Sequence, residues 1–319
     1  MGSGFPDPHF IDSNGIRMAV YEQGAGPAII LLHGFPELAF SWRHQLPALA
    51  AAGYRAIAPD QRGYGQTDCP ARVADYRIQQ LVADICGLLD RLELRQATFV
   101  GHDWGALLLW YMSLTCPERI ERQVILNIPF HARPPTDPIE LMRARLGDDF
   151  YIVNFQDSDE ADRAFAADPV HFFNMMMRKR QITRARYELL PPEKKVLDLR
   201  ATMARNHSGG TALLNEEERD YFASAYAKSG FSGPINWYRN WSDNWASLEG
   251  VQQIVRVPTL FIGAADDVII APGHIESMKK HVVDLEVHML DDCGHWSQQE
   301  KPDEVNALIL DWLLRRRVQ

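Results

Sequence analysis

The feature that most constrains the fold of this chain is a short turn, Gly-His-Asp-Trp-Gly at 101–105, between an apolar strand and a helix-forming run. We expect the strand over 97–100 and the helix from residue 106 onward. Glycine on both sides of the turn lets the strand and the helix approach closely and tolerates strained dihedral angles. This arrangement is typical of a nucleophile elbow, which presents the side chain at its tip for covalent chemistry.

The tip of this turn carries Asp103, where many hydrolases carry a serine. A serine that opens an alkyl electrophile is left as an ether, whereas an aspartate is left as an ester that activated water can cleave. An aspartate is also ionised at neutral pH without the help of a base. Asp103 therefore predicts attack on a saturated carbon, followed by hydrolysis of the ester. The alternative is a purely structural role, because aspartate is a favoured helix N-cap.

Strands alternate with helices through the first 130 residues and again after residue 246. An opening hairpin is expected over 10–23, with Asn14 and Gly15 in its turn. Further strands are expected at 27–32, 54–58, 97–100, 123–128, 257–262 and 285–290, and helices at 41–52 (with Ser41 as N-cap), 78–92 and 302–316. This alternation predicts an α/β fold with a mostly parallel sheet and helices on both faces.

The alternation stops between about residue 131 and residue 245, where the chain reads as helical, with no buried strand. Asn215 and Glu218 predict a capping box at the start of one of these helices. An insertion between two strands would lie over the carboxyl edge of the sheet, where open α/β sheets place their sites. We therefore predict an α/β core in two parts, residues 1–130 and 246–319, with a helical lid (cap) domain at 131–245 inserted between them.

Two further side chains complete a catalytic set. His295 follows the last strand and Asp267 follows the strand before it, so both are expected at the carboxyl edge of the sheet. The order nucleophile, acid, histidine is that of the α/β-hydrolase fold. We expect His295 to be the base that activates water, a role worth about 10²–10⁴-fold in rate, and Asp267 to orient it. The adjacent Asp266 is an alternative for this role, because the two aspartates have the same side-chain chemistry.

The ester carbonyl needs hydrogen-bond donors as negative charge develops on its oxygen. The backbone amides of Trp104, after the elbow, and of Phe35, in the His-Gly-Phe-Pro loop at 33–36, are the expected oxyanion hole. His33 and His102 are expected to orient these loops rather than to react.

Composition excludes several other classes of protein. The chain has 319 residues with a formal net charge of −9, which argues against a nucleic-acid or anionic-membrane partner. The four cysteines are scattered without a C-x-x-C pair, so we expect neither a disulfide framework nor a zinc site. No signal peptide or membrane span is recognisable, and a cytoplasmic location is expected.

These segments resemble the soluble epoxide hydrolases, a branch of the α/β-hydrolase family, from about residue 10 to the last helix. The resemblance is densest at 33–37, 60–65, 101–106, 110–112, 117–119, 126–130 and 293–296. In that family the acid stands nine residues after the proline that opens its strand, and counting from Pro258 gives Asp267. The resemblance implies a hydrolase that acts on ether bonds, without a metal or an organic cofactor.

The same resemblance implies two lid tyrosines that hydrogen-bond the epoxide oxygen. Tyr238 lies in an Asn-Trp-Tyr-Arg-Asn segment at 236–240, and Tyr151 lies in the matching segment at 150–156. A phenol stays protonated at neutral pH and can donate to the alkoxide that forms as the ring opens. Packing within the lid is the alternative role for either tyrosine.

The expected reaction follows from these roles. Asp103 opens the epoxide, and water activated by His295 hydrolyses the hydroxyalkyl ester to a vicinal diol. The expected partners are a small lipophilic epoxide and water, and the chain is expected to act as a monomer or a homodimer.

A haloalkane dehalogenase with the same Asp-His-Asp triad is the alternative activity. Its departing halide needs N–H donors, a role that Trp104 would fit. Phe35, in contrast, stands where many of those enzymes carry asparagine, and the segment around Tyr238 favours the epoxide. A binding protein that kept the fold is a third interpretation, whereas a serine esterase is excluded because the elbow has no serine.

Overall fold

The computed structural model describes residues 4–205 and 209–316. Eight strands form one sheet in the order β1-β2-β4-β3-β5-β6-β9-β10. The first two pairings are antiparallel and the other five are parallel. The strands are β1 (His9–Ser13), β2 (Ile16–Gln23), β3 (Ala28–Leu32), β4 (Arg55–Pro59), β5 (Ala97–His102), β6 (Ile120–Leu126), β9 (Thr259–Ala264) and β10 (Leu285–Leu290). The predicted, mostly parallel sheet is confirmed.

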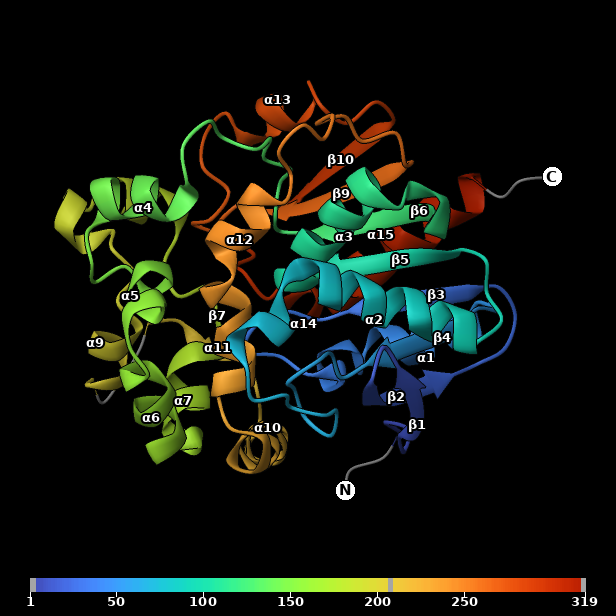
Figure 1. Cartoon of the computed structure of the whole chain (residues 1–319), viewed down its shortest axis with the longest axis horizontal. Helices are drawn as coiled ribbons and strands as arrows, with labels where there is room; N and C mark the ends of the chain where they lie inside the picture. The colour runs from blue at the N-terminus through green and yellow to red at the C-terminus, as the bar shows by residue number, and fades with distance from the viewer. Residues whose placement is uncertain (1–3, 206–208, 317–319) are drawn as a thin grey trace.

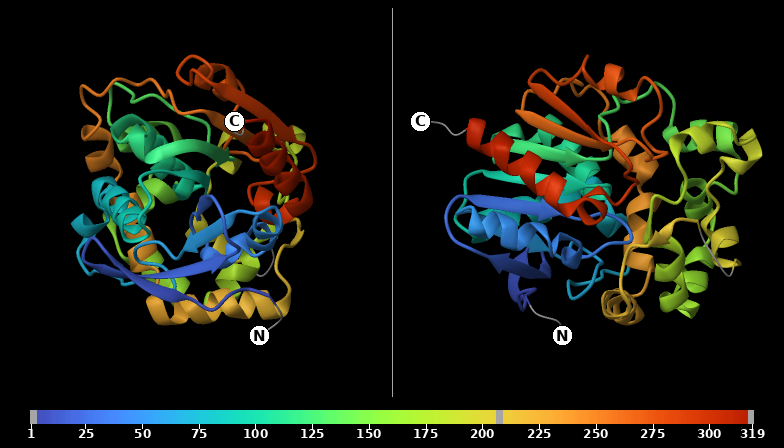
Figure 2. Two further views of the ribbon diagram at one scale, coloured as in Figure 1. Left: turned by 90° about the vertical axis from the view of Figure 1, so that its right-hand side faces the viewer. Right: turned by 180° about the vertical axis from the view of Figure 1, so that it is seen from behind.

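Helices cover both faces of this sheet. On one face lie α2 (Ile78–Arg91) and α3 (Trp104–Thr115), in front of the sheet in Figure 1. On the other face lie α1 (Gln45–Ala51) and α15 (Pro302–Arg315), which the view from behind in Figure 2 brings forward. Each helix turns apolar side chains to the strands, as Leu81 and Leu108 do on one face and Leu49 and Trp312 on the other. Two apolar cores result, as expected for a sheet buried on both faces.

Between β6 and β9 the chain forms a block of helices that we call the helical insertion (138–246), and Figure 1 shows it to one side of the sheet. Its helices are α4 (Pro138–Leu146), α5 (Tyr151–Asp157), α6 (Glu160–Ala167), α7 (Pro169–Met176), α8 (Arg184–Glu188), α9 (Leu199–Met203), α10 (Glu216–Ser229), α11 (Ser232–Arg239) and α12 (Trp241–Ala246). Two short strands at the surface, β7 (Arg178–Lys179) and β8 (Thr211–Ala212), pair antiparallel as a small separate sheet, with α8 and α9 between them in the chain.

The predicted capping box is present at the start of α10. The Asn215 side chain accepts the Glu218 amide, and the Glu218 side chain accepts the Asn215 amide, each at 2.9 Å. The two bonds satisfy two amides that the helix itself leaves unpaired.

The prediction of a helix from Ser41 was wrong. Residues Ala39–Trp42 form a short 3₁₀ turn, and α1 begins only at Gln45, without a side-chain cap. Pro47 explains the shift, because proline is tolerated only in the first turn of a helix. The other predicted strands and helices agree with the structure to within three residues at each end.

No helix among the described residues combines the length and the apolar character needed to cross a membrane.

Candidate active site

The turn after β5 has a strained backbone at its tip. Asp103 adopts φ 51° and ψ −117°, a conformation that side-chain-bearing residues rarely adopt. A Cβ atom on Gly101 would lie 2.6 Å from the carbonyl oxygen of Gly105, and one on Gly105 would lie 2.0 Å from that of Leu32. Both glycines are therefore required by close backbone packing.

The Asp103 carboxylate lies at the start of a helix and accepts a backbone amide from another loop. The amide of Phe35 donates to Oδ1 of Asp103 at 2.8 Å. Trp104 is the first residue of α3, and the first amides of a helix have no acceptor within it. A helix N-terminus stabilises a nearby negative charge by about 0.3–1 kcal/mol. Of the two predicted donors, the Phe35 amide thus bonds to the carboxylate, and the Trp104 amide lies at the start of α3, directly after Asp103 in the chain.

Asp103, His295 and Asp267 meet at the carboxyl edge of the sheet. Nδ1 of His295 lies 2.8 Å from Oδ2 of Asp267, and Nε2 lies 3.7 Å from Oδ2 of Asp103. Asp267 also accepts the Ile269 amide at 3.0 Å and the Asn127 side-chain amide at 2.8 Å. The imidazole therefore stands between the two carboxylates, with one nitrogen turned to each.

The structure separates the two candidate acids by their contacts. Oδ1 of Asp266 accepts the Arg184 amide at 2.7 Å, and its other oxygen lies 3.5 Å from the Arg180 guanidinium. Asp266 thus faces the helical insertion, whereas Asp267 faces His295.

The electrostatics of this group depend on mutual charge. Burial alone would raise the pKa of Asp267, but the charge and the hydrogen bond of His295 outweigh it and lower that pKa. Burial would lower the pKa of His295, yet Asp267 and Asp103 together hold it well above its ordinary value. His295 is therefore a cation as long as both carboxylates are ionised.

Two tyrosines of the helical insertion lie over Asp103. Tyr151 is the first residue of α5 and Tyr238 lies in α11, with ring centroids 5.7 Å apart. The Tyr238 ring packs edge to face against Phe35 at 5.4 Å and Trp104 at 5.0 Å. Burial raises the pKa of both phenols, and the nearby charge of Asp103 raises it further. Both hydroxyls are thus protonated donors at neutral pH.

Three other tyrosines of the helical insertion have partners away from Asp103. The Tyr226 hydroxyl donates to the Glu37 carbonyl at 3.2 Å, Tyr221 stacks on Phe40 at 4.3 Å, and the Tyr187 hydroxyl lies 3.5 Å from the Lys195 carbonyl.

Sequence reasoning assigned no role to Glu37, whose buried carboxylate joins several loops. It accepts the Gly34 amide at 3.0 Å and lies 2.7 Å from Nδ1 of His102. Nε2 of His102 lies 2.7 Å from the carbonyl oxygen of His295. Both ring nitrogens of His102 thus face oxygen atoms, and the ring connects the Glu37 carboxylate to the backbone of His295. A glutamate between Pro36 and Leu38 in an apolar loop is the signal that could have indicated this role.

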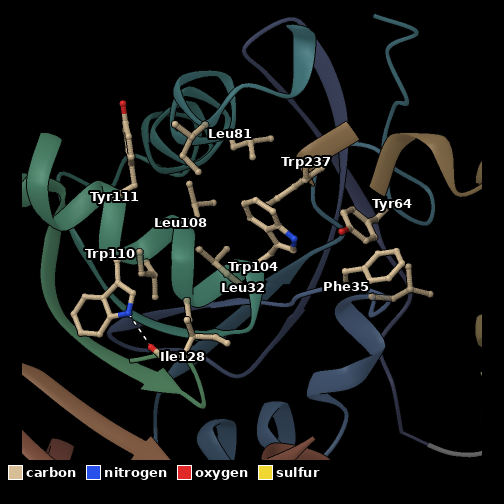
Figure 3. Packing of buried hydrophobic residues seen from close by; sticks show 14 of the residues in the cluster. Leu32, Phe35, Tyr64, Leu81, Trp104, Leu108, Trp110, Tyr111, Ile128 and Trp237 are labelled. Carbon is tan, nitrogen blue, oxygen red and sulfur yellow. Dashed lines mark hydrogen bonds between the residues drawn. The ribbon is translucent and has the colours of Figure 1, made fainter. Parts of the chain in front are cut away.

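Aromatic side chains wall the site on the side of α3. Figure 3 shows Trp104 between Leu108 of α3 and a cluster of Phe35, Tyr64 and Trp237. A cavity of about 440 Å³ adjoins Trp104, and apolar side chains dominate its lining. These include Leu107, Leu114, Phe130, Met142, Trp241 and Leu248. Within the described parts of the chain, no group of three or more His, Cys, Asp or Glu side chains is arranged to hold a metal ion.

Known proteins resemble this chain in sequence and in fold along most of its length. Residues 27–302 match the family described as the α/β hydrolase fold. Epoxide hydrolase A of Mycobacterium tuberculosis is 38% identical in an alignment 320 residues long, which covers 97% of this chain and 98% of that protein. Epoxide hydrolase 3 of Siraitia grosvenorii is 40% identical in an alignment 315 residues long, which covers 95% of this chain and 96% of that protein. The crystal structure of an epoxide hydrolase from Vigna radiata, 35% identical, superposes with a TM-score of 0.87 over 99% of this chain and 100% of that one. The dehalogenase alternative finds no support in these relatives.

Proposed function

This chain belongs to the epoxide hydrolases of the α/β-hydrolase fold, and from that premise we propose that it opens its epoxide through a covalent ester on Asp103. In this reaction a carboxylate oxygen attacks a ring carbon, the carbon–oxygen bond of the ring breaks, and a hydroxyalkyl ester forms. Water then hydrolyses the ester to a vicinal diol and restores the carboxylate.

The main support for this proposal is that the two carboxylate oxygens of Asp103 have different neighbours. Oδ1 accepts the Phe35 amide at 2.8 Å, so it is suited to become the ester carbonyl oxygen. Oδ2 faces His295 at 3.7 Å and is the oxygen that attacks carbon. The water that later attacks the ester carbon then approaches from the side of His295, and the Phe35 and Trp104 amides stabilise the oxyanion.

Tyr151 and Tyr238 act on the leaving oxygen. Both phenols belong to the helical insertion, both are protonated, and both lie over the Asp103 carboxylate. They donate hydrogen bonds to the epoxide oxygen, and one of them transfers its proton to the alkoxide as the ring opens.

Esterification itself prepares His295 to act as a base. The charge of Asp103 is one of the causes of the raised pKa of His295, after the charge of Asp267. Forming the ester removes that charge, so the pKa of His295 falls and the ring releases its proton, which restores the phenol that protonated the alkoxide. The neutral imidazole, still held by Asp267 at 2.8 Å, then deprotonates water.

The surroundings favour a lipophilic substrate. The cavity of about 440 Å³ beside Trp104 is lined mainly by apolar side chains, and such cavities hold apolar ligands. We propose that residues 131–245 act as a lid on a core formed by 1–130 and 246–319, because the two tyrosines reach the site from that segment. The proposed reaction needs no metal or organic cofactor.

Intact-protein mass spectrometry on His295→Gln tests the mechanism. Without its base the enzyme should form the ester but release it slowly, so a lipophilic terminal epoxide should add its whole mass to the protein. The double variant Asp103→Asn/His295→Gln is the matched control and should gain nothing. An adduct that persists in this control, or no adduct with epoxides of several sizes, would rule out the ester on Asp103.

A further inference from the structure

The Glu300 carboxylate, at the end of α14 (Ser297–Glu300), joins the loop of His295 to the helical insertion. Its Oε2 accepts the amides of Gly294 at 3.0 Å and Arg180 at 3.1 Å, and its Oε1 accepts the amide of Trp296 at 3.2 Å. Gly294 and Trp296 are the two neighbours of His295 in the chain. One carboxylate therefore holds the backbone on both sides of the histidine.

Other contacts complete the restraint on this backbone. The His295 carbonyl oxygen lies 2.7 Å from Nε2 of His102, and the Gly294 carbonyl accepts the Asn127 side chain at 3.3 Å. With the backbone held in this way, the freedom that remains to His295 is rotation of its side chain, and the bond to Asp267 limits that rotation.

The packing around Glu300 leaves little room for adjustment. A Cβ atom on Gly294 would lie 2.8 Å from Oε1 of Glu300 and 3.1 Å from the backbone of Arg180. Arg180 adopts a positive φ of 38°, and its guanidinium forms an ion pair with Asp292. The loop that carries His295, the Glu300 carboxylate and the end of β7 are thus in direct contact.

Burial raises the pKa of Glu300, while the three amides act in the opposite direction. Among the described residues within hydrogen-bond reach of this carboxylate, the donors are backbone amides. A carboxylate held mainly by amides on a catalytic loop fixes local geometry, because each N–H donor has a defined direction.

We propose that Glu300 is a positioning residue for His295, and that it acts on hydrolysis of the ester rather than on its formation. The inference rests on the function proposed above. Ester formation uses Asp103 and the two tyrosines, and none of these contacts Glu300. Hydrolysis uses Nε2 of His295, whose position follows from the backbone that Glu300 holds.

Pre-steady-state kinetics of Glu300→Gln test this inference. The amide keeps the shape of the side chain but turns an NH₂ group toward backbone N–H donors, so at least one of the three bonds is lost. Rapid mixing followed by acid quench and mass spectrometry gives the two rates separately. We expect hydrolysis to slow by about 10–100-fold, the effect of a displacement of up to 1 Å, and ester formation to change little. The ester should then accumulate at steady state.

Controls separate positioning from general stability. Glu304→Gln removes an exposed carboxylate that pairs with Lys301 at 2.8 Å, and both rates should stay as in the parent enzyme. Glu300→Asp keeps the charge with a shorter reach, and it should slow hydrolysis less than Glu300→Gln does. If Glu300→Gln does not fold, Glu300→Asp alone decides by the same two rates.

Equal slowing of both steps, or no change in hydrolysis, would overturn the positioning role. The trap with His295→Gln keeps this result distinct from a failure of the proposed function. If the trap accumulates ester and Glu300→Gln does not, the function stands and the role of Glu300 is wrong. If neither accumulates ester, the ester mechanism itself fails.

Discussion

The sheet side of the active site and the side of the helical insertion hold their reactive groups by different forces. On the sheet side, Asp103, Asp267 and His295 are fixed by short hydrogen bonds to named donors and acceptors. On the other side, Tyr151 and Tyr238 are fixed through their rings, which pack edge to face against aromatic neighbours.

The difference matches the tasks that we propose for the two sides. A nucleophile and a base need defined directions, which hydrogen bonds supply. A phenol that follows a moving oxygen needs a fixed ring with a hydroxyl that can turn, and aromatic packing supplies this.

The largest expected effect in this comparison concerns the two neighbouring aspartates of the sheet side. Asp267→Asn should slow ester hydrolysis by about 10²–10⁴-fold, the contribution of a correctly held base. Asp266→Asn is the matched control, since that carboxylate contacts the helical insertion, and it should leave hydrolysis nearly unchanged. Single-turnover kinetics on both variants provide the measurement. A larger loss in Asp266→Asn would reverse the assignment of the acid.

The tyrosines should show the opposite kinetic pattern. Tyr238→Phe and Tyr151→Phe each remove one donor to the developing alkoxide, and a hydrogen bond to a charged group contributes about 1.5–3 kcal/mol, or roughly 10–150-fold in rate. The loss should fall on ester formation and leave hydrolysis unchanged. Tyr187→Phe is the control, because its hydroxyl lies near the Lys195 carbonyl. If Tyr238→Phe or Tyr151→Phe slows hydrolysis instead, the helical insertion does not act on ester formation alone, and the proposed comparison fails.

The smallest expected effect concerns the packing that holds the tyrosines. Phe155 lies 5.6 Å from Tyr151 and 5.2 Å from Tyr238 between ring centroids. Phe155→Leu should lower the free energy of unfolding by about 1–3 kcal/mol and slow ester formation modestly. Chemical denaturation and single-turnover rates measure the two effects. If hydrolysis slows as much as ester formation, this packing supports the sheet side as well.

Much of the fold and several site residues follow from local sequence patterns. The strands, the elbow glycines and the capping box of α10 depend on residues close together in the chain, and such patterns can be read without tertiary information. The order Asp103, Asp267, His295 also follows, because Asp103 comes directly after β5 and the other two lie in the loops that follow β9 and β10.

The remaining features depend on contacts between distant segments. The hydrogen bond between Glu37 and His102 joins residues 65 positions apart, and Glu300 meets Arg180 across 120 positions. No periodicity or motif of the sequence encodes these meetings. Asp266 and Asp267 differ only in the direction in which the end of β9 turns them, which needs the backbone itself.

The helical insertion leaves the sheet after β6 and returns to it at β9, and these two strands are hydrogen-bonded neighbours. The amide of Asn127, just after β6, donates to the Ile262 carbonyl in β9 at 3.0 Å, so the two strands are held together by their own hydrogen bonds, whichever segment connects them. Closing a longer or a shorter segment between them changes the chain entropy only slightly, by about 0.6 kcal/mol for each doubling of length. The architecture thus permits grafting, in which a whole insertion from a relative replaces this one and brings a different pocket to the same three side chains of the sheet.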